Sequence, residues 1–451
     1  MLIGLDVGTS GVKGVAIDED GNVAAVAEEG YPLSAPVPGW AEQDPEDWWR
    51  ASQRVLAQLP EGPVGLSGQM HGLVVMGSHD EILRPAILWN DQRTGPECAE
   101  IERRIGLERL LELTGNRALP GFTAPKLLWL QRHEPEVHGR IRHVLLPKDY
   151  IRFRLTGERT IDAADASGTL LFDVAHRRWS EEVCDALEVP HAWLPSAGES
   201  TEVATAGDQA AGALGVGIVA PGALSIVLGT SGVVFAVLPR YEVDPRLHVF
   251  CHAVPGTWHA MGVMLSAAGS LSWFRDVVGT DYVALDAEAA RWEPGVEGLL
   301  FAPYLAGERT PHVDPDARGA FTGLSLRHDR GALARAVMEG VAFGLRDSLE
   351  LLRDLGVEAS VGRVSGGGAR SDLWVRIVAS ALRLPIERMQ LEEGAAYGAA
   401  LLAGVHAGVF TDAEEAVERC VRVRETIAPE WDYEETYAQF RSLYPTLKEL
   451  R

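Results

Sequence analysis

The chain opens with an apolar run, a glycine-rich link and a second apolar run, which is the pattern of a β-hairpin. This pattern covers residues 2–17 and has Gly-Thr-Ser-Gly at 8–11 as its link. It returns at residues 224–237, with Gly-Thr-Ser-Gly at 229–232. The two links lie 221 residues apart in a chain of 451, whereas solenoid repeats recur every ~20–50 residues. The repetition therefore predicts two related domains.

Helical patterns occur between and after the hairpins. Residues 44–59 begin with a capping aspartate, a proline and acidic residues, which is typical of a helix start. Residues 331–355 carry apolar positions at helical spacing, as a buried helix does. Strands that alternate with helices predict an α/β fold with a mixed sheet in each half.

The domain boundary is expected just before the second hairpin, because the first pattern is complete there. We expect an N-terminal domain at 1–203 and a C-terminal domain at 204–429. A last helix at about 430–451 is expected to pack back on the first domain. The two domains should close on each other by a hinge.

Composition narrows the class of protein. A hydrophobic content of 46% and a charged content of 23% are ordinary for a globular protein. The net charge of -23 opposes nonspecific binding to nucleic acid and to anionic membranes, and no apolar run reaches the ~18 residues of a membrane span. The four cysteines form no CxxC pair, which argues against structural zinc and favours the cytoplasm. A homodimer is expected, since dimers are the commonest assemblies.

An acidic protein repels ATP, so a nucleotide site needs a local positive field. The two turns supply one, because their backbone N–H groups point into a concavity and their small side chains allow close approach. The residues assigned to phosphate binding are Gly8, Thr9, Ser10 and Gly11 in the first turn and Gly229, Thr230, Ser231 and Gly232 in the second. Each turn alone is better explained as a tight hairpin. Their duplication favours a phosphate clamp.

Two acidic residues are candidates for phosphoryl-transfer chemistry. Asp6 precedes the first turn, where Mg²⁺ would be needed between the carboxylate and a phosphate; its alternative role is to cap the turn. Asp208 lies among glycines and alanines at 206–213, so a substrate can approach it closely. It is a candidate general base, and its alternative role is a helix N-cap.

Three further segments follow apolar stretches. Gly367 and Gly368 belong to a glycine run at 365–371 that suits an adenosine packed on backbone, although a plain turn is an alternative. Ser-Gly-Gln-Met-His-Gly at 67–72 and Trp-Asn-Asp-Gln-Arg at 89–93 place polar groups beside the Trp89 ring, as a polyol site would. Trp89 and Asn90 are therefore candidate sugar-binding residues.

These residues together resemble the FGGY carbohydrate kinases. The resemblance runs from Asp-Val-Gly-Thr-Ser-Gly-Val-Lys at 6–13 to 394–404 and includes two family signatures, at 121–129 and 319–339. The segments at 67–72 and 89–93 are similar to the branch that phosphorylates D-xylulose.

The resemblance implies an actin-like, ribonuclease-H-like fold duplicated into two domains, with a sugar and ATP in the cleft between them. It implies that Asp208 is the general base and that Asp6 supports Mg²⁺. The remaining implied contacts are Met70, His71 and Gln209 with the sugar, Lys13 and both turns with the phosphates, and Gly367 and Gly368 with adenosine.

The chain departs from the family pattern at two places. Relatives have an extra helix and strand between a Ser-Thr-Glu-Val-like segment and the catalytic Gly-Asp, but here residues 200–203 are followed almost directly by Gly207 and Asp208. Either residues 201–205 replace the lost strand or domain closure and activity are impaired. Position 209 is Gln where some relatives have Asn, which implies a different substrate tolerance.

Two alternatives to a D-xylulose kinase remain at this stage. One is a kinase for another polyol, such as ribulose, gluconate or glycerol. The other is an actin-like ATP-binding or sugar-binding protein that does not transfer phosphate.

Overall fold

The computed structural model describes residues 1–391 and 393–450 and contains two large mixed sheets. The first sheet has the order β13-β5-β1-β2-β3 and the second the order β16-β17-β15-β14-β20-β21-β22. The first comprises β1 (Leu2–Val7), β2 (Gly11–Ile17), β3 (Val23–Gly30), β5 (Val64–Gly68) and β13 (Thr205–Gly207). The second comprises β14 (Ala223–Leu228), β15 (Gly232–Leu238), β16 (His248–Cys251), β17 (Trp258–Met264), β20 (Val361–Ser365), β21 (Ile386–Met389) and β22 (Val423–Ile427).

The two sheets share one topology. β1 pairs antiparallel with β2 and parallel with β5, and β14 pairs in the same way with β15 and β20. On one side, β3 pairs with β2 as β17 pairs with β15. On the other side, β13 pairs with β5 as β21 pairs with β20. The predicted α/β fold of two duplicated domains is confirmed, and each Gly-Thr-Ser-Gly turn connects the corresponding strands.

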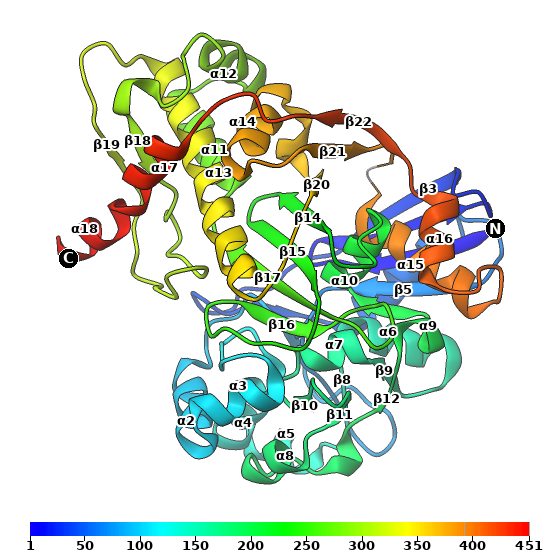
Figure 1. The fold of residues 1–451 in the computed structure, drawn as a ribbon. Coiled ribbons are helices and arrows are strands. Elements are labelled where there is room, and N and C mark those ends of the chain that lie inside the picture. The colour runs from blue at the N-terminus through cyan, green and yellow to red at the C-terminus, as the bar shows by residue number, and fades with distance from the viewer. Residues whose placement is uncertain (392, 451) are drawn as a thin grey trace.

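Helices cover both sheets, and smaller elements form a region beside the first sheet (Figure 1). The helices up to the second hairpin are α1 (Pro45–Leu56), α2 (Gly95–Ile105), α3 (Leu107–Thr114), α4 (Thr123–His133), α5 (Pro135–Arg140), α6 (Pro147–Thr156), α7 (Ala163–Ser167), α8 (Glu181–Ala186), α9 (Ser200–Val203) and α10 (Asp208–Gly215). Those that follow are α11 (Ala268–Val278), α12 (Tyr282–Ala289), α13 (Arg330–Asp354), α14 (Asp372–Leu382), α15 (Gly394–His406), α16 (Ala413–Cys420), α17 (Glu434–Arg441) and α18 (Leu443–Glu449). The predicted helices at 44–59 and 331–355 are α1 and α13, and Asp44 caps α1 by accepting from the Glu46 amide.

Short strand pairs and 3₁₀ turns complete the chain. The pairs are β4 (Glu42–Gln43) with β7 (Ala86–Ile87), β6 (Val74–Met76) with β8 (His143–Leu145), β9 (Thr160–Asp162) with β12 (Ser196–Gly198), β10 (Phe172–Asp173) with β11 (Arg178–Trp179), and β18 (Leu300–Ala302) with β19 (Ala320–Thr322). The 3₁₀ turns are η1 (His191–Trp193), η2 (Val296–Gly298) and η3 (Gly367–Arg370).

The shortened junction still provides a strand to the first sheet. Thr205–Gly207 forms β13, which pairs in parallel with β5, and the Thr205 hydroxyl donates to Asp162 at 2.9 Å. Residues 201–203 belong to the short helix α9, so of the junction residues 201–205 only Thr205 belongs to this strand. The chain passes to the second sheet only after α10, later than the predicted boundary at 203/204.

The C-terminal helices lie on the second domain, contrary to the predicted packing of 430–451 on the first. α17 contacts α13 and β18. The cause is a buried polar contact: Tyr433 donates to Glu339 at 2.7 Å, and Glu339 is paired with Arg335 at 2.7 Å. The side chains of Tyr437 and Phe440 join the hydrophobic core around α13.

A different C-terminal helix, α15, crosses to the first sheet and packs on β1, β5 and α10. Glycines make this close approach possible. A Cβ on Gly4 would lie 1.9 Å from the carbonyl oxygen of Ala396, and a Cβ on Gly398 would lie 1.8 Å from that of Ala211. The chain thus returns to the first domain and holds the two halves together next to Asp208.

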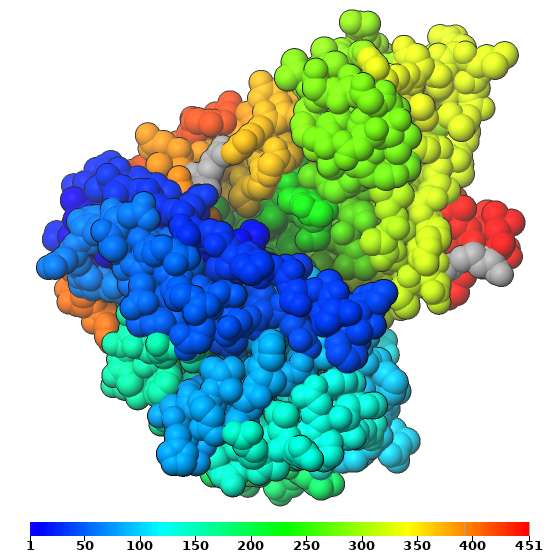
Figure 2. Space-filling view, turned by 180° about the vertical axis from the view of Figure 1, so that it is seen from behind, coloured from blue at the N-terminus to red at the C-terminus, as the bar shows by residue number. Residues whose placement is uncertain are grey.

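The molecular surface is hollowed between the N-terminal part, coloured blue, and the second half, coloured green (Figure 2). No helix in the described ranges 1–391 and 393–450 is long and apolar enough to cross a membrane.

Candidate active site

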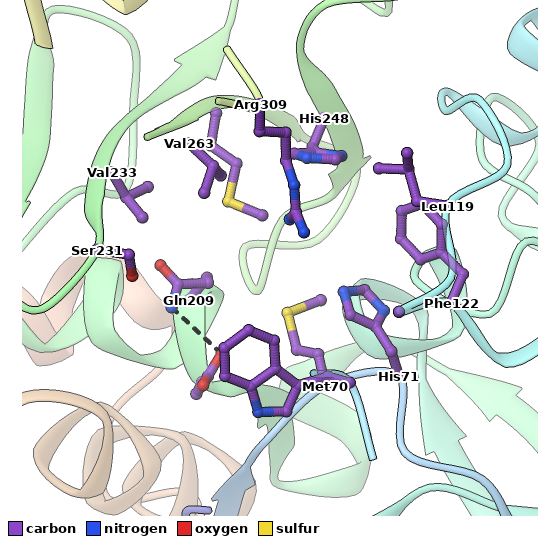
Figure 3. A pocket seen from close by; sticks show the side chains of 14 residues that line it. Met70, His71, Leu119, Phe122, Gln209, Ser231, Val233, His248, Val263 and Arg309 are labelled. Carbon is purple, nitrogen blue, oxygen red and sulfur yellow. Dashed lines mark hydrogen bonds between the residues drawn. The ribbon is translucent and has the colours of Figure 1, made fainter. Parts of the chain in front are cut away.

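A cavity of about 280 Å³ lies between the two domains. Its lining comes from both halves: Met70, His71, Trp89, Leu119, Gly121, Phe122, Asp208, Gln209, Ser231, Val233, His248, Met261, Val263 and Arg309. Aromatic and aliphatic faces surround a few polar groups, as in sites for small polar ligands. The predicted residues Met70, His71, Trp89, Gln209 and Ser231 thus lie together with Asp208 (Figure 3).

Asp208 lines this cavity, and Asp6 lies near enough for its charge to affect the pKa of Asp208. Asp208 is the first residue of α10, where Gly207 is the cap residue, and its carboxylate accepts from the Gln209 amide at 3.4 Å. Burial raises the pKa of Asp208 to about 7, and the nearby charge of Asp6 adds to the rise. Burial also raises the pKa of Asp6 to about 6, although Ser67 and Lys13 lower it. A carboxylate with a pKa near neutrality is suited to general base catalysis.

The first turn is held in place by a network of amide and aromatic side chains. Trp89 donates from its ring nitrogen to the Thr9 hydroxyl at 2.9 Å, and Gln43 donates to the Thr9 carbonyl at 2.7 Å. Gln69 donates to the Gly8 carbonyl at 3.3 Å, and Tyr31 donates to the same oxygen. These hydrogen bonds to the carbonyl oxygens of Gly8 and Thr9 hold the backbone of the turn in place.

The second turn adjoins the predicted adenosine loop. A Cβ on Gly366 would lie 3.0 Å from the backbone nitrogen of Gly229, and one on Gly368 would lie 2.6 Å from the Leu228 side chain. A Cβ on Gly367 would meet nothing within 4 Å, so that backbone faces open space. The structure therefore brings Gly367 and Gly368 to the second turn, although they follow it by more than 130 residues in the sequence.

His71 is positioned by the signature at 121–129. Its φ of 66° is in the left-handed region, and its carbonyl accepts from the Lys126 ammonium at 2.8 Å and from the Thr123 hydroxyl at 3.1 Å. Its ring nitrogen Nδ1 lies 2.7 Å from the carbonyl oxygen of Gly168. Burial lowers the pKa of His71 to about 3, so the ring is neutral in the cavity.

Two predicted residues are placed differently from the rest. The Lys13 ammonium lies 2.6 Å from Glu393 and 3.3 Å from Glu28, so it is held by carboxylates. Burial lowers the pKa of Lys13, but Glu393 and Glu28 outweigh this and raise it. Asn90 does not belong to the cavity lining, although its neighbour Trp89 does.

Arg309 and His248 line the cavity but were not found from the sequence. Arg309 follows β18 in a loop, and His248 begins β16 at the edge of the second sheet. The sequence offers a hint only for Arg309, which lies in the polar segment Gly-Glu-Arg-Thr-Pro at 307–311. Such a segment predicts a loop but does not predict a sugar site. Neither residue has a neighbour in the sequence that indicates a sugar.

Asp6 could hold the metal ion that phosphoryl transfer from ATP requires. In the described part of the chain, Asp6 Oδ1 is buried without a hydrogen-bond partner. An unpartnered carboxylate oxygen is a ligand of the kind that Mg²⁺ prefers, so Asp6 is the residue that could hold this ion.

Comparisons with known proteins agree with this geometry. The N-terminal domain of the FGGY family of carbohydrate kinases matches residues 1–238, and its C-terminal domain matches residues 224–407. The xylulose kinase of Escherichia coli is 43% identical over 90% of both chains. The xylulose kinase of Rhodospirillum rubrum superposes with a TM-score of 0.92 at 32% identity, over 100% of this chain and 99% of the other.

A third relative is longer than this chain. The xylulose kinase of Lactococcus lactis is 38% identical, and its alignment covers 100% of this chain and 97% of the relative. It extends over 488 positions, against 451 residues here, so the relative has residues that this chain lacks. The matches nevertheless span both domains, and the chain belongs to the FGGY family of carbohydrate kinases.

Proposed function

We propose that this protein transfers the γ-phosphoryl group of ATP to the O5 hydroxyl of D-xylulose. The observation that carries the proposal is the position of Asp208, a carboxylate with a pKa of about 7 in a cavity that also contains Met70, His71 and Ser231 of the second turn. Two xylulose kinases match 90% and 100% of this chain, at 43% and 38% identity.

The sugar lies in the cavity with its O5 hydroxyl at Asp208. Trp89 and Phe122 offer aromatic faces for its C–H groups, while Gln209 and His71 offer polar groups for its hydroxyls. The nucleotide lies along the second turn, with its adenosine beside Gly367 and Gly368 and its phosphates between the two turns.

Asp208 takes the O5 proton while O5 attacks the γ-phosphorus in line. The new O5–P bond forms as the bond from the γ-phosphorus to the bridging oxygen breaks, and ADP leaves with that electron pair. The backbone N–H groups of both turns stabilise the charge on the transferring group. Mg²⁺, held by Asp6, would neutralise phosphate charge. Closure of the two domains excludes water from the reaction.

A substrate panel tests this function directly. ADP release and sugar phosphate formation would be measured with D-xylulose, D-ribulose, gluconate and glycerol at equal concentrations. D-Xylulose should give the highest kcat/KM, with product phosphorylated at O5. A higher kcat/KM for another member of the panel would overturn the choice of substrate, and sugar binding without any sugar phosphate would overturn the transfer activity.

The activity should depend on pH through Asp208. The base acts in its ionised form, and burial together with Asp6 raises its pKa to about 7. Therefore kcat/KM for D-xylulose should fall as pH decreases below 7, by about tenfold per pH unit. The profile would be measured from pH 5.5 to 8.5, with circular dichroism confirming that the fold persists. A profile that stays flat down to pH 5.5 would contradict the role of Asp208.

The proposed setting is the cytoplasm, since Cys98, Cys184, Cys251 and Cys420 are buried free thiols. The homodimer stays a prediction.

A further inference from the structure

The end of the cavity away from Asp208 carries the Arg309 side chain, whose charge is attracted by the neighbouring Glu308 carboxylate. Arg309 extends into the cavity between His248 and Met70 (Figure 3). In the described ranges of the chain its guanidinium takes part in none of the hydrogen bonds or ion pairs of the structure. An arginine whose guanidinium forms no hydrogen bond or ion pair with the described residues has donors available for a ligand.

The backbone of Arg309 is fixed, so this orientation is built into the fold. The buried Glu308 carboxylate accepts from the Arg309 amide at 2.8 Å and from the Leu265 amide at 3.0 Å. The next residue, Thr310, exchanges two hydrogen bonds with Val263 of β17, at 3.0 and 3.1 Å. The loop therefore holds Arg309 against the second sheet.

His248 presents a hydrogen-bond acceptor beside Arg309. The side-chain nitrogen of Asn116 donates to two backbone carbonyls, so its Oδ1 is an acceptor, and His248 Nδ1 at 3.1 Å must carry the proton. His248 Nε2 is then a bare acceptor, and it is buried without a partner among the described residues. Burial and the charge of Arg309 keep the pKa of His248 well below its usual value, so the ring is neutral.

The structure of a ketopentose indicates which of its groups could bind the Arg309 guanidinium and the acceptor His248 Nε2. In the furanose ring of D-xylulose O5 is bonded to C2, so only the open-chain ketone has a free O5 hydroxyl. When O5 lies at Asp208, the opposite end of the open chain carries the C2 carbonyl, an acceptor, next to the O1 hydroxyl, a donor. This pair complements Arg309 and His248.

Resting on the proposed function, we infer that Arg309 and His248 form a subsite for the hydroxyketone end of the open-chain sugar. Arg309 donates to the C2 carbonyl oxygen, and His248 Nε2 accepts from the O1 hydroxyl. The subsite selects ketoses over polyols, because a polyol has no carbonyl oxygen for the guanidinium. It also selects the open-chain form, in which O5 is free to react.

Variants measured on matched substrates test the subsite. Arg309→Met and His248→Phe would be assayed with D-xylulose, with 1-deoxy-D-xylulose, which lacks O1, and with xylitol, which lacks the carbonyl. Arg309→Met should lower kcat/KM for D-xylulose about 100-fold but for xylitol less than about fivefold, since a hydrogen bond to a charged donor is lost only with the ketone. His248→Phe should lower kcat/KM for D-xylulose about tenfold and leave that for 1-deoxy-D-xylulose nearly unchanged.

The loss in Arg309→Met should appear chiefly in KM, because the contact lies far from the reacting oxygen and is already made in the ground state. Binding of D-xylulose without ATP, followed by tryptophan fluorescence, should weaken in parallel. Arg309→Lys, which keeps the charge, should show a smaller loss. Arg327→Met, which removes an exposed arginine, is the matched control and should behave as the wild type.

The outcomes separate this inference from the proposed function. A wild-type protein that does not phosphorylate D-xylulose would overturn the function itself. If the wild type is active but Arg309→Met loses the same factor on all three substrates, or loses nothing, the subsite assignment is wrong. Thermal melting of each variant identifies a loss caused by misfolding, and Arg309→Gln then replaces Arg309→Met in the comparison.

Discussion

Replacing Asp208 by asparagine should lower kcat for D-xylulose by about 10³-fold, within the range expected for loss of a general base. The amide has nearly the same shape, so the cavity and the contact from Gln209 should persist, but it has no basic oxygen for the O5 proton. The measurement is single-turnover formation of sugar phosphate at saturating ATP and D-xylulose.

Binding and stability distinguish a chemical effect from a structural one. Asparagine removes one of two neighbouring acids whose pKa values are raised by burial, so the melting temperature should not fall. D-Xylulose should still change the tryptophan fluorescence. Asp276→Asn, at an exposed position on α11, is the matched control. Near-normal turnover in Asp208→Asn would remove Asp208 from the reaction.

The elements that sequence could predict are those whose signal is local. Each Gly-Thr-Ser-Gly turn lies between two apolar runs, so the hairpins follow from neighbouring residues, and their repetition reveals the duplicated fold. Asp208 was identifiable because small residues surround it in the sequence.

What could not be predicted depends on contacts between distant segments. Lys13 lies within the otherwise apolar strand β2, and nothing near it in the sequence reveals that Glu393, almost 400 residues away, pairs with its ammonium. The packing of the last helices was missed because it depends on Tyr433 joining the buried Arg335–Glu339 pair. Arg309 and His248 meet only when a loop after β18 folds over β16 and β17.

A second large effect is expected where the first domain contains a buried charge cluster. The Lys148 ammonium lies 2.6 Å from Asp149, 2.7 Å from Asp162 and 2.8 Å from Asp165, and all four side chains are inaccessible to solvent. Asp162 also accepts from Thr205 of the short strand β13, which precedes Asp208 by one residue. The cluster thus connects the fold of the first domain to the position of Asp208.

Lys148→Met should destabilise the first domain by roughly 3–5 kcal/mol near neutral pH, because it leaves buried carboxylates without their cation. The loss should depend on pH. Without Lys148 the carboxylates have folded-state pKa values above their unfolded ones, so protonation favours the folded state at low pH and stability decreases as pH rises. Urea unfolding followed by circular dichroism at pH 5.5 and pH 8 should show the larger loss at pH 8.

A double variant tests whether the loss of stability comes from unpaired charge. Lys148→Met combined with Asp165→Asn removes one of the unpaired charges and should recover part of the stability at pH 8, whereas Lys448→Met, at an exposed position, should change nothing. If Lys148 contributed only by filling space, the single variant would be equally unstable at both pH values and Asp165→Asn would not help it. A pH-independent loss would therefore show that packing, and not charge, holds β13 and Asp208 in place.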